Sequence, residues 1–199
     1  MRSDRLASTA RNDCATRTVT YYERNLPHWH PEGRAIFLTW RLHGSLPSSF
    51  VHRLRALSKA PGKQFLEADQ RLDAGVTGPR WLSDPRIARY AEDALERGAD
   101  LGYFVLHAYV VMPNHVHLLL EPHVPLPRIT MGIKGASARN ANRALGRAGK
   151  PFWQDESFDH WVRNEAQLDR IRSYIHRNPV KAGLVKHPAD WPWSSARPR

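Results

Sequence analysis

His115 and His117 are separated by one residue and come directly after the turn-forming pair Pro113-Asn114. In a β-strand, residues two apart point to the same face, so the two imidazoles would project side by side. Neutral imidazoles at this spacing can chelate one divalent cation. Glu121 lies on the same face of a regular strand and is a candidate for a further ligand or a base. A chain with 11 histidines also contains such pairs by chance, so the pair alone does not establish a metal site.

Tyr174 and Asn178 are four residues apart and share one face of any helix that contains them. A tyrosine hydroxyl has an unperturbed pKa of about 10, so it attacks a phosphodiester near neutral pH only if its surroundings activate it. The pair also has a structural interpretation. Tyr174 would then be a core aromatic with its hydroxyl at the surface, and Asn178 would cap a turn that begins at Pro179.

The charge balance favours a polyanion as the partner. Lys and Arg number 30 against 19 Asp and Glu, which gives a formal net charge of +11 and a pI near 10.4. No acidic residue occurs between Glu121 and Asp155, and Arg139, Arg143 and Arg147 recur in that interval at helical spacing. Without interleaved acids such a row repels itself, so we expect a phosphate backbone to bind it. The affinity should fall steeply as the salt concentration rises.

The composition excludes several classes of protein. The single cysteine, Cys14, rules out an internal disulfide and a cysteine-based zinc cluster. No stretch approaches about 18 consecutive apolar residues, and residues 1–20 carry no legible secretory signal, so we expect a cytoplasmic protein without a membrane partner. The length favours one domain over residues 21–199, with a flexible polar leader over 1–20 and an insertion over 60–82.

The elements that must position these residues follow from the apolar pattern and from capping signals. Strands are predicted over residues 35–43, 101–112, 115–121 and 157–163. Helices are predicted from Pro47, from the Asp84-Pro85 cap to Gly98, over 128–147, and from an Asn164–Gln167 capping box to Pro179. This order predicts an α+β, ferredoxin-like split βαβ fold, an antiparallel sheet with helices on one face. A helical insertion would follow the first strand, and an additional helix would close the chain.

Two segments resemble a known family. Residues 110–119 (VVMPNHVHLL) resemble the histidine–hydrophobic–histidine motif of the HUH single-strand-specific tyrosine transposases, and residues 174–185 (YIHRNPVKAGLV) resemble their catalytic-tyrosine helix. Residues 151–154, 160–163 and 190–195 are similar to the branch of REP-associated tyrosine transposases, which are linked to repetitive extragenic palindromes in bacterial chromosomes. The resemblance covers residues 28–195 and leaves the leader outside.

The resemblance implies a transposase and DNA endonuclease with a ferredoxin-like fold. A divalent metal ion, Mg²⁺ or Mn²⁺, would be held by His115, His117 and Asn178, where insertion-sequence relatives usually carry glutamine at the third position. Tyr174 would attack single-stranded or hairpin DNA and form a 5′-phosphotyrosine, leaving a free 3′-hydroxyl for strand transfer in DNA transposition or recombination. The protein would be nucleoid-associated and act as a monomer or a homodimer. The histidines by themselves are equally suited to zinc.

Basic residues on the predicted helices and strands are candidates for DNA contacts, and Trp40 and Trp161 on the first and last strands are candidates for stacking on unpaired bases. The candidate DNA-binding residues are Arg41, Lys134, Arg139, Arg143, Arg147, Arg163 and Lys181.

Two other functions remain open at this level. In a metal-dependent phosphodiesterase the ion would activate water, and Tyr174 would be structural. In a non-catalytic module a ferredoxin-like sheet would bind structured nucleic acid through strand aromatics. A covalent protein–DNA adduct would distinguish the transposase from both.

Overall fold

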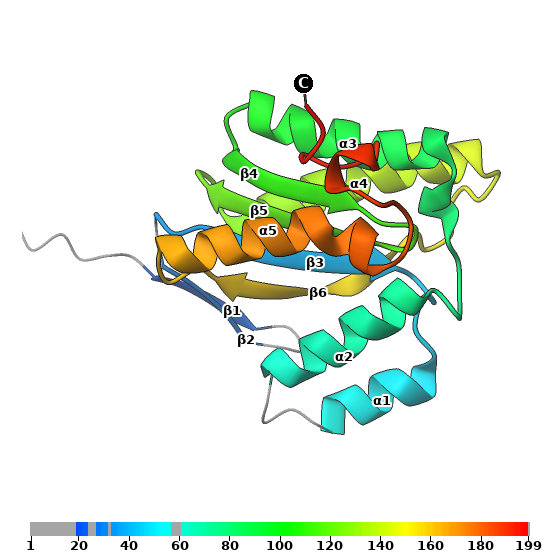
Figure 1. Ribbon diagram of the computed structural model, residues 1–199, viewed down its shortest axis with the longest axis horizontal. Helices are drawn as coiled ribbons and strands as arrows, with labels where there is room; N and C mark the ends of the chain where they lie inside the picture. Colours follow the sequence, from blue (N-terminus) through cyan, green and yellow to red (C-terminus); the bar gives the residue numbers. More distant parts are fainter. Residues whose placement is uncertain (1–18, 24–26, 32, 57–60, 199) are drawn as a thin grey trace, which may run out of the picture.

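The computed structural model describes residues 19–23, 27–31, 33–56 and 61–198, and its centre is one four-stranded antiparallel sheet in the order β4-β5-β3-β6 (Figure 1). The strands of this sheet are β3 (Ile36–Leu42), β4 (Phe104–Val111), β5 (His115–Pro122) and β6 (Trp153–Trp161). The helices are α1 (Ser48–Ala56), α2 (Pro61–Ala74), α3 (Pro85–Asp100), α4 (Leu126–Ala144) and α5 (Glu165–Lys181). A separate two-stranded sheet pairs β1 (Val19–Glu23) with β2 (Pro27–Pro31).

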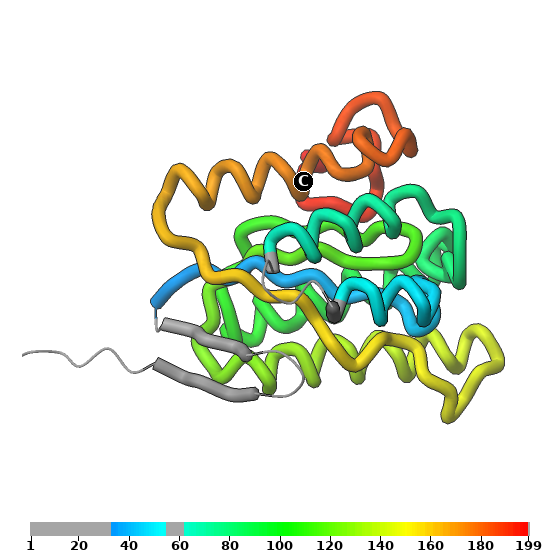
Figure 2. Tube along the Cα trace, turned by 90° about the horizontal axis from the view of Figure 1, so that it is seen from below, coloured from blue at the N-terminus to red at the C-terminus, as the bar shows by residue number. Residues whose placement is uncertain are grey.

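The strand order confirms the predicted ferredoxin-like topology. β3 and β4 run parallel on either side of β5, and β5 and β6 run parallel on either side of β3. The helices that complete these two crossovers, α3 and α4, lie against each other on one face of the sheet, as expected for a split βαβ fold (Figure 2). The helical insertion and the additional C-terminal helix, α2 and α5, cover the other face.

Alternation along β3 separates the two faces. Ile36, Leu38 and Trp40 point into a large apolar core beneath α3 and α4. Phe37 packs on the opposite face with Ile175 of α5. The second face has a smaller apolar cluster because polar residues of the central strands share it, and these are the residues of the candidate active site.

Helix α3 begins as predicted, with the Asp84 carboxylate accepting a hydrogen bond from the Arg86 N–H at 2.9 Å and proline in the first turn. The predicted end at Gly98 is wrong, because the helix continues to Asp100. Gly98 serves packing instead: a Cβ at this position would lie 2.7 Å from a Phe104 ring carbon. The left-handed residue that follows the helix is Gly102, with φ +70°.

Helix α5 begins at its predicted cap, where the Asn164 side chain accepts from the Gln167 N–H at 2.9 Å. The predicted end at Pro179 is wrong, because the helix runs on to Lys181. Proline removes one backbone donor, and here the loss falls in the last turn, where Leu184 N–H still donates to the Pro179 carbonyl at 2.9 Å. Lys181 therefore stays on the helix and faces the site.

Within the segment expected to be an insertion, 60–82, residues 61–74 form helix α2 and residues 81–82 belong to a short 3₁₀ turn. Helix α2 packs on the site face, where Phe65 joins the smaller apolar cluster. Residues 1–18 of the predicted leader lie outside the described residues, and Val19 and Thr20 belong to β1. The division into a leader and one catalytic domain stays a prediction. Within the described part of the chain, no helix is long and apolar enough to cross a membrane.

Candidate active site

The predicted histidine pair converges as expected from its position on a strand. His115 and His117 are both fully buried on β5, which is a central strand of the sheet. Their Nε2 atoms lie 3.0 Å apart. Burial, and then the neighbouring imidazole, lower the pKa of His115 below its usual value, so this ring is neutral and offers a lone pair.

Each histidine is oriented through its other ring nitrogen. His115 Nδ1 donates to Asn114 Oδ1 at 2.7 Å, and His117 Nδ1 lies 2.7 Å from the Thr39 hydroxyl of β3. The Asn114 amide also donates to the Leu72 carbonyl of α2 at 2.9 Å. These contacts aim both Nε2 atoms at one point, as the hydrogen bond at the other ring nitrogen does in metal-binding histidines.

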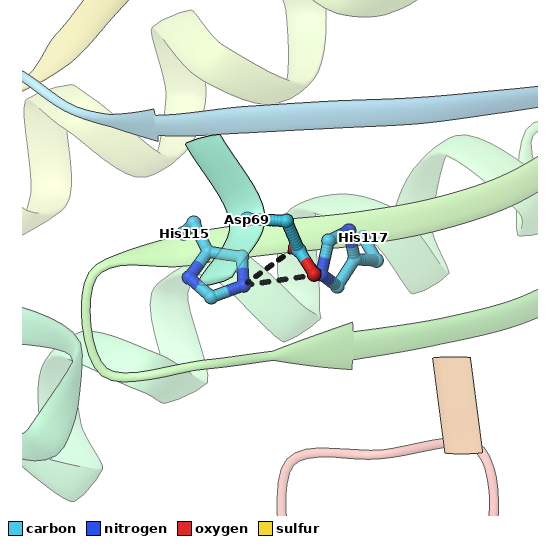
Figure 3. Close-up of side chains that lie close together, drawn as sticks. All are labelled: Asp69, His115 and His117. Carbon is cyan, nitrogen blue, oxygen red and sulfur yellow. Dashed lines mark hydrogen bonds and ion pairs between the residues drawn. The ribbon is translucent and has the colours of Figure 1, made fainter. Parts of the chain in front are cut away.

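Asp69 of α2 supplies a third group that sequence reasoning missed. Its Oδ1 atom lies 3.1 Å from His117 Nε2 and 3.9 Å from His115 Nε2, and its side chain is completely buried (Figure 3). A usable signal was present, because Phe65, Asp69 and Leu72 share the spacing of one helix face. The proline and glycine residues around this segment masked that signal.

Asp69, His115 and His117 fit a divalent cation. Ligand atoms at right angles around an ion, each about 2.1 Å from it, lie about 3.0 Å apart, and this is the separation of the two Nε2 atoms. The buried Asp69 Oδ1 has no hydrogen-bond donor in the described part of the chain. Two imidazoles and a carboxylate suit Mn²⁺, and also Zn²⁺ and Fe²⁺, so the donor set indicates a divalent cation without specifying the element.

Tyr174 of α5 reaches the same cluster within a single chain. Its hydroxyl donates to Asp69 Oδ2, the second oxygen of the carboxylate that faces the histidines. Its ring packs edge-on against Phe37 and against the His117 ring, with centroids 6.0 Å and 5.5 Å apart. Burial, together with the charge of Asp69, raises the pKa of the Tyr174 phenol, so the arrangement holds it protonated.

Asn178, one turn beyond Tyr174, is buried beside the histidines. Its Nδ2 lies 3.3 Å from His117 Nε2, and its Oδ1 has no hydrogen-bond partner among the described residues. The two amide atoms have nearly the same shape, so rotating the amide by half a turn would present Oδ1 to the cluster as a fourth donor. The predicted ligand position is therefore within reach of the site.

Lys181, expected to contact DNA, lies against two carboxylates. Its Nζ is 3.1 Å from Asp69 Oδ2 and 2.9 Å from Asp73 Oδ2. Burial, and then the charge of Asp69, raise the pKa of Asp73, whereas Lys181 opposes that rise. The lysine thus neutralises part of a concentrated negative charge that α2 brings to the site.

Glu121, the other candidate considered from the sequence, does not join the cluster. It lies near the far end of β5, where its carboxylate is 3.6 Å from His107 Nε2 of β4. Among the described histidines, cysteines and acidic residues, the group with metal-ligand geometry is Asp69, His115 and His117.

The arginine row on α4 lies on the far side of the sheet from the histidines. Arg139 and Arg143 are exposed on α4, which covers the opposite face. The prediction that Arg147 extends this row is wrong, because α4 ends at Ala144. Arg147 folds back over the Trp81 ring, with its guanidinium carbon 4.1 Å from the ring centroid.

The other predicted basic contacts are dispersed. Lys134 donates to the carbonyls of Gln154 and Asp155 at 2.6 and 2.9 Å and so ties α4 to β6. Arg163 is exposed beside Trp161. Arg41 alone among them lines a cavity next to Asp69.

Comparisons with known proteins show which proteins the chain resembles. Residues 80–178 match the family model described as "Transposase IS200 like". Over this segment, which is just under half of its length, the chain is similar to the IS200-like transposases. The matched segment contains His115, His117, Tyr174 and Asn178, whereas Asp69 lies outside it.

The relatives confirm the resemblance to the REP-associated branch. The REP-associated tyrosine transposase of Escherichia coli (strain K12) is 31% identical over 93 residues, 46% of this chain and 54% of that protein. A relative from Haemophilus influenzae is 30% identical over 101 residues, 44% of this chain and 56% of that protein. The chain thus spans about half the length of the curated relatives it matches.

A solved structure of a REP-associated tyrosine transposase bound to a REP hairpin has the same fold. It superposes with a TM-score of 0.56 at 22% identity, covering 87% of this chain and 82% of that one. The fold prediction from the sequence is therefore confirmed by both the strand order and this neighbour.

Proposed function

We propose that this protein is a metal-dependent enzyme that nicks single-stranded DNA and transfers the strand through a 5′-phosphotyrosine at Tyr174. One observation carries the proposal. The Tyr174 hydroxyl donates to Asp69, and the other oxygen of this carboxylate lies 3.1 Å from His117 Nε2. A nucleophile and a cation site thus share one carboxylate within one chain.

The proposed reaction is a transesterification. The phenolic oxygen of Tyr174 forms a bond to phosphorus, and the bond from phosphorus to the 3′-oxygen breaks. The phenol proton leaves along the hydrogen bond that Asp69 accepts and passes to solvent, and the leaving 3′-oxygen takes up a proton from solvent to become a hydroxyl. Because a phosphotyrosine replaces a phosphodiester, a second 3′-hydroxyl can reverse the step and join strands without another energy source.

A divalent ion, Mg²⁺ or Mn²⁺, would be held by His115, His117 and Asp69, with Asn178 as a further donor. When bound, it would polarise the scissile phosphate and offset the charge of Asp69 that disfavours a phenolate. The protein's own contribution is to aim both imidazoles through Asn114 and Thr39 and to hold the Tyr174 ring against Phe37.

Hairpin-forming repeats are the proposed substrate class. A formal charge of +11 supports a nucleic-acid partner, and a neighbour of the same fold is bound to a REP hairpin. The exposed Arg139 and Arg143 would contact phosphates away from the cleaved bond, since the sheet separates them from Tyr174.

The test is incubation of the purified chain with labelled hairpin oligonucleotides that carry single-stranded flanks, with and without Mn²⁺. We expect an adduct that survives denaturation and depends on the metal, is lost in Tyr174→Phe and is retained in Tyr90→Phe, a tyrosine of α3. Cleavage by Tyr174→Phe at a rate near that of the unmodified protein would instead indicate a phosphodiesterase that activates water. Hairpin binding without any cleavage would indicate a non-catalytic module.

A further inference from the structure

A cavity of about 470 Å³ lies beside the active-site cluster, between α1 and α2 on one side and β3 and β6 on the other. Asp69 lines this cavity, and so does Thr39, whose hydroxyl contacts His117 Nδ1. A nucleotide in the cavity would therefore lie next to a phosphate that Tyr174 attacks. The volume falls in the range of small-ligand sites.

Aromatic side chains form part of the cavity wall. Phe65 of α2 and Phe158 of β6 stack on each other, with centroids 4.4 Å apart and planes inclined by 26°. Phe65 also meets the Tyr174 ring, at 6.2 Å between centroids, so one aromatic surface runs from the nucleophile into the cavity. Such surfaces bind nucleobases by stacking, irrespective of their sequence.

Arg41 of β3 adds a cation to the cavity lining, which also contains the carboxylates of Asp69 and Glu156. Its guanidinium is half-buried and donates to two neutral oxygens at long distances, the Leu42 carbonyl at 3.5 Å and the Ser45 hydroxyl at 3.4 Å. Burial lowers its pKa to about 10, so it remains charged at neutral pH. A guanidinium has five N–H donors, so most of them remain for an acceptor in the cavity.

We propose that this cavity binds one unpaired base of single-stranded DNA, from a nucleotide next to the scissile phosphate. The base would lie against Phe65 and Phe158 with an edge rich in acceptors toward Arg41. A base within a duplex is paired and stacked and cannot enter. The cavity would thus select the single-stranded flank of a hairpin, and it would prefer a base that presents carbonyl and ring-nitrogen acceptors.

The position of the bound nucleotide rests on the proposed nicking function, but the binding of a base does not. Most of the cavity lining comes from β3, the segment after it, α1 and α2, which precede the segment matched by the transposase family model at residues 80–178. The rest of the lining, Phe158 included, comes from β6 within the matched segment.

The test uses Tyr174→Phe protein in buffer with EDTA, so that metal-dependent cleavage does not consume the DNA, and a hairpin whose single-stranded flank has four random nucleotides. The bound fraction is sequenced for four proteins: Tyr174→Phe itself and the same protein with Phe65→Ala, Arg41→Gln or Leu66→Ala. Leu66 is the matched control, because it is half-exposed on α2 and does not line the cavity. We expect enrichment of one base at one flank position, lost with Phe65→Ala or Arg41→Gln and kept with Leu66→Ala.

An abasic nucleotide at the enriched position should weaken binding about tenfold, and only about twofold or less in the Phe65→Ala protein. If Phe65→Ala fails to fold, Ala68→Phe serves instead, because Ala68 lines the cavity and the larger side chain would fill it. An identical base profile in all four proteins would refute the binding of a base in this cavity and would leave the proposed nicking function untouched. A base preference that depends on the cavity, in a chain that forms no adduct with DNA, would keep the pocket and reject the nicking function.

Discussion

The two faces of the central sheet bury different kinds of side chain. The face under α3 and α4 carries the larger apolar core, with side chains such as Leu95 and Leu118 fully buried and with dispersed buried polar groups such as Glu92. The face under α2 and α5 buries a carboxylate, two imidazoles and an amide in close contact, and two of their atoms, Asp69 Oδ1 and Asn178 Oδ1, lack a hydrogen-bond partner among the described residues. Burying such groups costs free energy unless a partner satisfies them. We infer that one face stabilises the fold and that the other is built for a ligand.

The largest expected effect comes from a substitution on the face under α2 and α5, where the ligand would bind. His117→Ala should lower metal-dependent cleavage of hairpin DNA about a thousandfold or more, because a bound metal stabilises the transition state by several kcal/mol. Hairpin affinity should fall less than about threefold, since phosphate contacts dominate binding. Cleavage assays and fluorescence anisotropy measure the two quantities. Equal losses in both would mean that the histidine maintains structure rather than chemistry.

The next prediction concerns the role of α2. Asp69→Asn should weaken Mn²⁺ binding about a hundredfold, measured by titration calorimetry, because it removes the anionic donor between the two imidazoles. Asp73→Asn is the matched control on the same helix, and it should change the affinity far less, since Asp73 approaches the histidine pair only to 3.8 Å, at His115 Nε2, whereas Asp69 lies 3.1 Å from His117 Nε2. Similar losses in both variants would show that the helix contributes general negative charge and not a ligand.

Part of this site could be predicted from the sequence and part could not. The histidine pair and the tyrosine helix follow local rules, namely strand alternation and helical spacing, and both positions hold in the structure. Asp69 could not be placed in the same way. Its contact with His117 spans 48 residues and depends on how α2 docks on the sheet, which no local pattern specifies. Arg147 shows the opposite error, since helical spacing placed it on a helix that ends three residues earlier, at Ala144.

The fold was more predictable than the site because it depends on the order and type of elements. Four strands and the helices between them permit few topologies once crossovers must be right-handed. The errors at Gly98 and Pro179 concern helix ends, where packing decides. Gly98 makes room for the Phe104 ring, and Pro179 is accepted in a last turn that other backbone bonds close.

A third prediction concerns the apolar core under α3 and α4. Leu95→Ala removes a fully buried side chain of α3 and should lower the free energy of unfolding by about 2–5 kcal/mol. Mn²⁺ affinity of the folded protein should stay within about twofold of the unmodified protein. Met131→Ala on α4 is the control, because that side chain is 69% exposed and its removal should hardly change stability. A loss of Mn²⁺ affinity in folded Leu95→Ala protein would refute the separation of the two faces.

The smallest expected effect concerns the surface of α4. Replacing Arg139 and Arg143 together with glutamine should weaken hairpin binding and reduce the slope of log affinity against log salt by about 1.5–2. Arg86→Gln is the matched control, because the Asp84 carboxylate already pairs with Arg86 at 2.7 Å. Anisotropy titrations at several salt concentrations measure the slope. An unchanged slope in the double variant would remove α4 from the DNA-binding surface.

The most direct test of the account is anomalous diffraction at the manganese edge from crystals of the full chain soaked in Mn²⁺. The account predicts one strong peak within bonding distance of His115 Nε2, His117 Nε2 and an Asp69 oxygen, with the Tyr174 hydroxyl of the same chain beside it. A peak elsewhere, or an ion bound to the histidines with Asp69 turned away, would contradict it.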